Sequence, residues 1–261
     1  MKYFLLVFWA CMFCLLPLPV TASAGTDAVT GKQLAQDVFH RDRGKNSVLS
    51  SQMVLVDKND NKRVRQFTSK RILDDTLERQ IIRFTFPADI EGTGFLTIEK
   101  PGWETEQFIY LPALRRTRRI VTSQKSHRFV NSDFTYEDME RHPVDDYTYR
   151  ITGSQTIGGI ACHAMETRPK KGVQSQYSLT QSLITKDSLV PVLVKYFDKK
   201  GSHIKTYKVL KLEKIQDIWT ELIISMEDHE REHSTFLKVE NITYNTDIDQ
   251  ADVSRNRLEN Y

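Results

Sequence analysis

Apolar and polar side chains alternate along most of this chain, and this alternation restricts the fold more than any other feature of the sequence. It is clear in the segments 81–86, 147–151, 192–197, 222–226 and 235–239. A period of two residues is typical of β-strands with one buried face. Turn-forming segments separate such runs, as at 58–61 and 198–201. We therefore predict roughly eleven to thirteen strands, joined mainly as antiparallel hairpins.

Helical signals are few. An amphipathic helix is predicted over residues 32–41, with Thr30 as its cap, and a short second helix over 136–141. A single sheet with this many strands has to curl to cover its apolar face, and the helices then fill the concave side. We expect a mainly β (α+β) fold in one domain over residues 25–261, because no linker, repeat or composition change divides the chain.

The first residues have the pattern of an export signal. Lys2 is followed by an apolar run over residues 3–20 and by Ala22-Ser23-Ala24. This order predicts a secretory signal peptide over residues 1–24, cleaved after Ala24, and a soluble product. The alternative is an uncleaved membrane anchor, against which Pro17 and Pro19 argue.

Cysteine content and charge exclude several classes of protein. Cleavage leaves Cys162 as the one cysteine, so we expect no intramolecular disulfide and interpret Cys162 as a small buried residue. Of 37 basic residues, cleavage removes Lys2, and the remaining 36 nearly balance 34 acidic ones. Such a balance does not favour binding to nucleic acid.

Two neighbouring blocks of opposite charge stand in the central third of the chain. The first block is basic and follows Tyr110-Leu111-Pro112. The second is acidic and reads Ser-Asp-Phe-Thr-Tyr-Glu-Asp-Met at 132–139. Ion pairing on one folded surface explains such blocks as well as a binding role does. The candidate polar or partner-contact residues are Arg115, Arg116, Arg118, Arg119, Asp133, Glu137 and Asp138.

These segments carry a family resemblance. The matching pieces are Gly-Thr-Gly-Phe-Leu at 92–96, Trp103, residues 110–116, residues 118–120 and Ser-Asp-Phe-Thr-Tyr-Glu-Asp at 132–138, with a weaker match around Tyr196. With them the chain resembles the outer-membrane lipoprotein-sorting protein family, relatives of the periplasmic lipoprotein carriers LolA and LolB. Two positions depart from that family: Asn131 stands where it usually has Gly, and Val253-Ser254 where it usually has Phe-Thr.

The resemblance implies a LolA-like incomplete β-barrel whose helices lie over an apolar cavity. It implies a non-enzymatic periplasmic carrier for a lipid or the acyl chains of a lipoprotein, without cofactor or metal. The implied partners are an inner-membrane transporter and an outer-membrane acceptor, and we expect a monomer. A periplasmic regulator that senses lipid or lipoprotein is the alternative within the binding class.

Aromatic residues crowd the central third of the chain. An acyl chain gains about 0.8 kcal/mol per buried CH₂, so these rings are candidates for lipid binding, although the sequence does not separate them from packed core. The candidates are Phe84, Phe86, Phe95, Trp103, Phe108, Tyr110, Phe129, Phe134 and Tyr136.

One motif points to an enzyme. His229-Glu230-Arg231-Glu232-His233 matches the His-Glu-x-x-His pattern of zinc hydrolases, in which a helix aligns both imidazoles. Here the surrounding residues are polar and strand patterns lie on both sides, so no buried helix is expected. We interpret the motif as a solvated hairpin turn.

Overall fold

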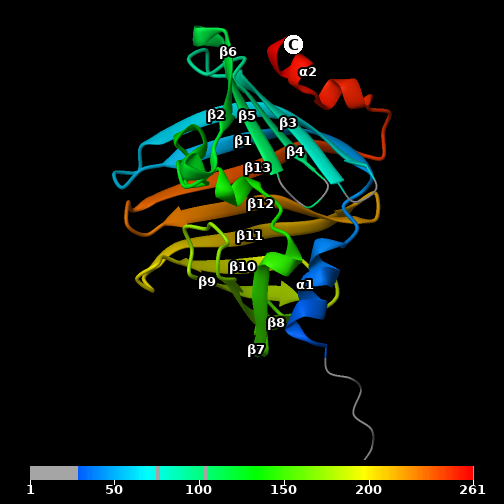
Figure 1. Ribbon diagram of the computed structural model, residues 1–261, viewed down its shortest axis with the longest axis vertical. Helices are drawn as coiled ribbons and strands as arrows, with labels where there is room; N and C mark the ends of the chain where they lie inside the picture. The colour runs from blue at the N-terminus through cyan, green and yellow to red at the C-terminus, as the bar shows by residue number, and fades with distance from the viewer. Residues whose placement is uncertain (1–28, 75–76, 101, 103–104, 261) are drawn as a thin grey trace, which may run out of the picture.

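Thirteen strands of the described chain form one antiparallel sheet (Figure 1). The computed structural model describes residues 29–74, 77–100, 102 and 105–260, so the predicted signal peptide and Trp103 lie outside it. The strands are β1 (Asn46–Val56), β2 (Lys62–Asp74), β3 (Leu77–Phe86), β4 (Gly94–Glu99), β5 (Thr105–Leu111), β6 (Arg116–Ile120), β7 (Tyr147–Ile157), β8 (Ile160–Pro169), β9 (Leu179–Thr185), β10 (Pro191–Phe197), β11 (His203–Ile215), β12 (Ile218–Asp228) and β13 (His233–Tyr244). The predicted β-rich fold is confirmed.

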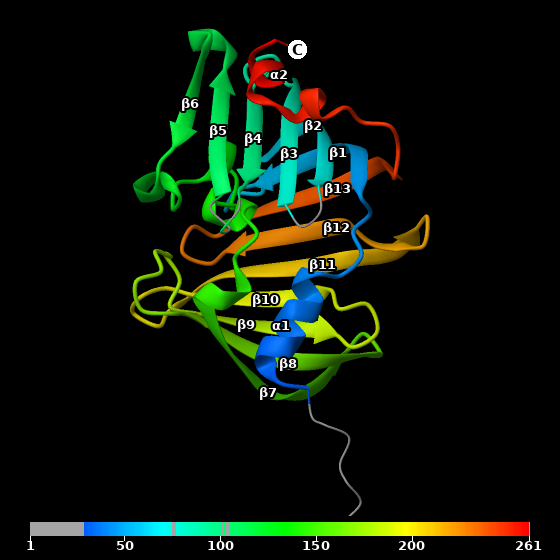
Figure 2. The same cartoon turned by 45° about the vertical axis from the view of Figure 1, so that its right-hand side comes forward.

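The strand order determines how the chain runs across the sheet. The order is β6-β5-β4-β3-β2-β1-β13-β12-β11-β10-β9-β8-β7, so every neighbouring pair except β1 and β13 is consecutive in sequence. Strands β6 and β7 are also consecutive in sequence, yet they form the two opposite edges of the sheet. Residues 121–146, which we call the crossing segment, therefore have to pass from one edge to the other over a face of the sheet (Figure 2).

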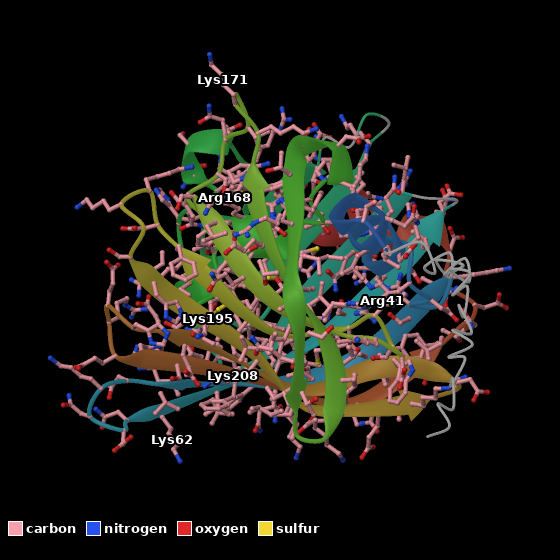
Figure 3. The ribbon with its side chains drawn as sticks, turned by 90° about the horizontal axis from the view of Figure 1, so that it is seen from below. Arg41, Lys62, Arg168, Lys171, Lys195 and Lys208 are labelled. Atoms are coloured by element: carbon pink, nitrogen blue, oxygen red, sulfur yellow. The ribbon has the colours of Figure 1, made fainter. Side chains whose placement is uncertain are left out.

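The sheet curls without closing, and α1 (Gly31–Phe39) and the crossing segment lie on its inner side (Figures 1 and 2). Seen from below, the strands surround the inner side chains (Figure 3). The cap predicted for α1 is confirmed, because the Thr30 hydroxyl accepts a hydrogen bond from the backbone N–H of Gln33 at 3.1 Å. The expected incomplete barrel with few helices is the observed fold.

The second predicted helix, over 136–141, is wrong in extent. The structure has only a 3-10 turn at Glu137–Met139, and the backbone is extended again at Glu140. The Asp138 carboxylate accepts hydrogen bonds from both the backbone N–H and the hydroxyl of Thr135. Such local side-chain bonds compete with a continuing helix.

Aromatic packing attaches the first half of the crossing segment to β1–β6. Phe129 and Tyr136 pack against Phe84 and Phe95, and all four are buried. The ring centroids of Phe95 and Phe129 are 4.8 Å apart, and those of Phe84 and Phe129 are 6.0 Å apart. These separations are those of favourable tilted ring pairs, so this cluster is a packed core.

The opposite face of β2–β5 is covered by the C-terminal segment. Val253 and Leu258, next to and within α2 (Arg255–Glu259), pack against Leu96 and Phe108. Ser254 begins this helix by accepting a hydrogen bond from the backbone N–H of Arg257 at 3.2 Å. A threonine, usual in the family at this position, could make the same cap.

The other half of the molecule has two smaller clusters. Leu34 and Ala35 of α1 pack against Met165 and Ile184. Cys162 is fully buried in a second cluster, where burial raises the pKa of its thiol, and the prediction of a buried cysteine is confirmed. Helix α1 thus contacts the β7–β9 end of the sheet rather than its middle.

Two phenylalanines on β3 should respond differently to substitution. Phe84 is fully buried, whereas Phe86 is 49% exposed. We expect Phe84→Ala to lower the free energy of unfolding by about 3–5 kcal/mol, and Phe86→Ala by less than about 1 kcal/mol. Urea denaturation of both variants measures this, and equal losses would contradict the assigned core.

Candidate functional site

A cavity in two adjoining parts lies on the inner side of the sheet, between the crossing segment, α1 and strands β7–β12. Its larger part has a volume of about 430 Å³ and its smaller part about 220 Å³. Both parts are lined by Asp138, Glu140, His142, Val194 and Tyr196, so they adjoin, and we call them together the inner cavity. Ligand pockets in proteins have volumes of about 300–1,000 Å³, which includes this size.

The walls of the larger part are mainly apolar. They are formed by Val38, Phe39, Phe134, Pro191, Val194, Tyr196, Tyr207 and Met226, with charged side chains around them. Burial raises the pKa of Tyr196 and of Tyr207, so both phenols are neutral near pH 7. The wall therefore offers apolar area with a few neutral hydroxyls, as lipid and small-molecule sites do.

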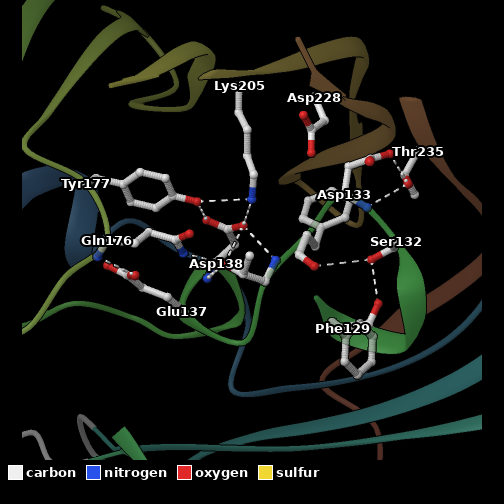
Figure 4. A network of polar contacts seen from close by, with 12 residues as sticks. Phe129, Ser132, Asp133, Glu137, Asp138, Gln176, Tyr177, Lys205, Asp228 and Thr235 are labelled. Carbon is white, nitrogen blue, oxygen red and sulfur yellow. Dashed lines mark hydrogen bonds and ion pairs between the residues drawn. The ribbon is translucent and has the colours of Figure 1, made fainter. Parts of the chain in front are cut away.

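Polar contacts hold the crossing segment over this cavity (Figure 4). The Asp138 carboxylate accepts hydrogen bonds from the Tyr177 hydroxyl at 2.7 Å and the Thr135 backbone N–H at 2.7 Å. Its ion pair with Lys205 of β11 has a distance of 3.2 Å. Because both partner side chains are almost fully buried, 7% and 2% exposed, this pair is isolated from water.

Asp133 connects the crossing segment to the β12–β13 hairpin. Its carboxylate is fully buried and accepts a hydrogen bond from the Thr235 hydroxyl at 2.7 Å. It also contacts the guanidinium of Arg231 at 3.0 Å and Nδ1 of His233 at 2.6 Å. A buried carboxylate without such partners would cost several kcal/mol.

Glu137 makes a third attachment. It accepts hydrogen bonds from the Ser175 hydroxyl and from the Gln176 backbone N–H, the latter at 3.0 Å. The Gln176 amide in turn donates to the Thr135 hydroxyl at 2.9 Å. The carboxylates of the 132–139 motif thus bind other parts of the same chain.

The departure at Asn131 has a structural explanation. Asn131 has a φ of +60° and follows Val130, which has a φ of +43°. Glycine adopts this left-handed region without strain, and asparagine tolerates it better than most residues do. The asparagine here can therefore form the same turn as the glycine that is usual in the family.

Comparisons with known proteins agree with this architecture. A family model described as that of an uncharacterized protein matches residues 76–260. A DUF1329 family protein from Desulfovibrio piger is 29% identical, with a TM-score of 0.83 over 87% of this chain and 97% of its own. A domain from Vibrio parahaemolyticus, named as an outer membrane lipoprotein-sorting protein, is 26% identical, with a TM-score of 0.82 over 88% and 98%.

The chain belongs to the LolA-like family. A LolA superfamily protein from Nitrosomonas europaea, 14% identical, shares the fold with a TM-score of 0.69 over 88% of this chain and all of its own. No protein with a curated description matches the sequence. In the described residues, no helix is both long and apolar enough for a membrane span.

The family's arginine-rich motif lies at the β5–β6 hairpin. Arg115, Arg116 and Arg118 are exposed there and line none of the cavities described here. Arg119 forms an ion pair with Glu106 at 3.1 Å and lines a separate, polar cavity of about 590 Å³. That cavity adjoins the inner cavity at Glu137, Glu140, His142 and Tyr147, so of the four arginines Arg119 alone lines a cavity next to the inner one.

The acidic candidates of the same motif are not at the surface. Asp133 and Glu137 are buried, and so is the carboxylate of Asp138. All three bind groups of the protein itself, so a partner could not contact them in this conformation. Their contacts attach the crossing segment to the rest of the chain.

The structure divides the aromatic candidates of this LolA-like chain into groups. Phe84, Phe95, Phe129 and Tyr136 pack against one another as core, and Phe134 lines the inner cavity. Phe108 and Tyr110 belong to the opposite face of the sheet, beneath Arg255 and Arg83 respectively, and Phe86 is exposed. Only Phe134 of the described candidates lies where a ligand in the inner cavity would contact it.

Sequence reasoning missed most of the cavity wall. Val194, Tyr196, Tyr207 and Met226 lie on β10, β11 and β12. Alternation identifies these segments as strands but does not distinguish a packed face from one that borders a cavity. The one available signal was the weaker family match around Tyr196.

The His-Glu-x-x-His motif forms a hairpin connection, as predicted. Strand β12 ends at Asp228 and β13 begins at His233. The described residues contain no group of three or more His, Cys, Asp or Glu that could hold a metal ion. The expectation that both histidines are solvated is wrong for His233, because the buried Asp133 requires it as a partner and its side chain is 11% exposed.

The two histidines should therefore differ in their effect on stability. We expect His233→Ala to lower the free energy of unfolding by about 1–3 kcal/mol, because it removes one partner of a buried carboxylate. His229→Ala should cost less than about 1 kcal/mol, since His229 is exposed and its ring contacts the Thr206 hydroxyl, at 2.8 Å, and the ring of His203 rather than a buried charge. Urea denaturation compares them, and an unchanged midpoint for His233→Ala would contradict the attachment at Asp133.

Proposed function

We propose that this protein is a periplasmic carrier that binds an acyl chain of a lipid or lipoprotein in the inner cavity. The observation that carries the proposal is the apolar wall formed by Val194, Tyr196, Tyr207 and Met226 under a crossing segment that does not fill the space above it. The family to which the chain belongs, and the lipoprotein-sorting name of its Vibrio parahaemolyticus relative, support a carrier rather than an enzyme.

The energetics of transfer favour an acyl ligand. Each CH₂ group moved from water into such a wall contributes about 0.8 kcal/mol, so a chain of several carbons can offset its own ordering. Neutral phenols in the wall add hydrogen-bonding groups without the cost of burying a charge. A carrier has to release its ligand again, so it requires an affinity of intermediate strength.

Delivery requires contacts outside the cavity. The β5–β6 hairpin exposes Arg115, Arg116 and Arg118 beside Leu114 and Val121, which are 62% and 50% exposed. Cationic and apolar groups together suit an acidic protein surface. We assign this hairpin to contact with the membrane partners, an inner-membrane transporter and an outer-membrane acceptor, and the carrier itself to a monomer.

Filling the cavity should abolish binding without unfolding the protein. Val194 lines both parts of the inner cavity, and Val194→Trp would place an indole in this space. We expect its affinity for a fluorescent fatty acid to fall by at least about tenfold, a loss of about 1.4 kcal/mol, with little change in unfolding free energy. Probe titration and urea denaturation measure the two quantities.

Leu210→Trp is the matched control. Leu210 is 53% exposed on β11, so the same new side chain would lie in solvent and leave binding unchanged. If Val194→Trp binds the probe as well as the control does, the ligand does not occupy the inner cavity. If the wild type binds no acyl ligand at all, the carrier function is rejected.

Export is tested separately. We propose that residues 1–24 are removed on secretion and that the mature chain begins at Gly25, because Ala22-Ser23-Ala24 follows the apolar run. The intact mass of protein recovered from the periplasm should correspond to residues 25–261. Retention of residues 1–24, or a fatty-acylated cysteine, would refute the cleavage.

A further inference from the structure

Two arginines lie at one end of the inner cavity, just after α1. Arg41 and Arg43, together with Glu221 of β12, line both its larger part and a neighbouring cavity of about 140 Å³. These three side chains therefore separate the apolar wall from a second space. Any amphiphile lying along Val194 and Tyr207 would meet charged groups here.

The arginines belong to a larger ionic cluster. Its contacts are Arg43–Glu78 at 2.8 Å, Arg71–Glu78 at 3.5 Å, Arg141–Glu99 at 3.1 Å and Arg41–Glu221 at 3.4 Å. Among these residues four guanidinium groups face three carboxylates, because Arg43 and Arg71 share Glu78. With all groups ionised, the cluster carries one excess positive charge.

Arg41 stands next to this excess charge, and its own ion pair is weak. Its side chain is 13% exposed, and its ion pair with Glu221 is long for a charge-assisted hydrogen bond, which usually measures about 2.7–2.9 Å. Burial lowers the pKa of the Arg41 guanidinium, which is the expected effect of removing a cation from water. An incomplete pair in such a place favours an additional anion.

Other acidic groups at the larger part of the cavity do not supply that anion. Asp138 is paired with Lys205, and Glu140 contacts Lys125 at 2.7 Å, so each already has its own cation. Glu137 lines the smaller part of the cavity, where the Ser175 hydroxyl and the Gln176 backbone N–H donate to it. The cationic excess at Arg41 and Arg43 is therefore not cancelled within the larger part.

We propose that the inner cavity selects acyl ligands with an anionic head group, a phosphate monoester or a carboxylate, which binds Arg41 and Arg43 while the chain lies along Val194 and Tyr207. This selectivity rests on the carrier function proposed above. Guanidinium groups match both anions, because their N–H donors can pair with two oxygens at once. A neutral acylglycerol would leave the excess charge without a partner.

The test compares ligands that share one oleoyl chain. Oleoyl lysophosphatidic acid, oleate and monoolein compete with a fluorescent fatty acid for the wild-type protein, and inorganic phosphate is titrated alone. We expect at least one of the two anionic ligands to bind about tenfold or more tightly than monoolein, the effect of one charge-assisted hydrogen bond. Equal affinities for all three would overturn the selectivity but leave the carrier function intact, whereas no binding by any would reject both.

Substitutions of Arg41 and of Glu221 should shift the affinity for anionic ligands in opposite directions. Arg41→Gln should lower the affinity for the anionic ligands to about that for monoolein, and urea denaturation checks that the variant is folded. Glu221→Gln removes the acidic competitor of the ligand, so it should raise the affinity for the anionic ligands. If Arg41→Gln does not fold, the gain expected for Glu221→Gln decides the matter by itself, and a loss or no change overturns the proposal.

Arg168→Gln is the matched control, because Arg168 is an exposed arginine of β8 (Figure 3). It should bind every ligand as the wild type does, and an equal loss there would mean that general surface charge, not Arg41, sets the preference. Inorganic phosphate that displaces the probe as strongly as lysophosphatidic acid would assign the site to a free anion and reject the lipid head group.

Discussion

The chain has to cross the sheet between β6 and β7, and much of the remaining structure depends on that constraint. The two strands follow one another in sequence but form opposite edges of a sheet whose first and last strands, β1 and β13, pair within it. The polar groups of a connection that is buried against an apolar face cannot hydrogen-bond to water, so they need partners within the protein. The carboxylates of Asp133, Glu137 and Asp138 accept hydrogen bonds from β12–β13 and from residues 175–177. These hydrogen bonds give the buried polar groups of the crossing segment the partners that they need.

The same contacts explain where the inner cavity forms. Phe129 and Tyr136 bring the crossing segment into direct contact with the β1–β6 half of the sheet. Beyond them, Asp138 is joined to β11 through the long side chain of Lys205, so the backbone is held away from the sheet. The space that remains beneath it is lined by side chains such as Tyr207, whereas α1 covers only the β7–β9 end.

Local pattern predicted most of the fold, because strand alternation, the Thr30 cap and the turns are properties of neighbouring residues. It did not predict which aromatics border a cavity: Phe84 and Phe134 look equivalent in sequence, and what covers each depends on the crossing segment. The role of His233 was also hidden, since its partner Asp133 is 100 residues away in sequence. An acidic motif next to arginines suggested a surface, but folding buried its carboxylates and left all four arginines exposed.

One rule, that a buried charge needs partners, separates the structural charges of this protein from those that face a ligand. Asp133 is fully buried and has three side-chain partners within 3.0 Å, so it has no capacity to recruit another group. Arg41 is nearly as buried, but its recorded ion pair is a single 3.4 Å contact at the border of a cavity. A cation in that position is stabilised when an anion enters and is left incompletely paired when a neutral molecule does. The difference between the two sites lies in how completely each charge is paired, which depends on residues distant in sequence.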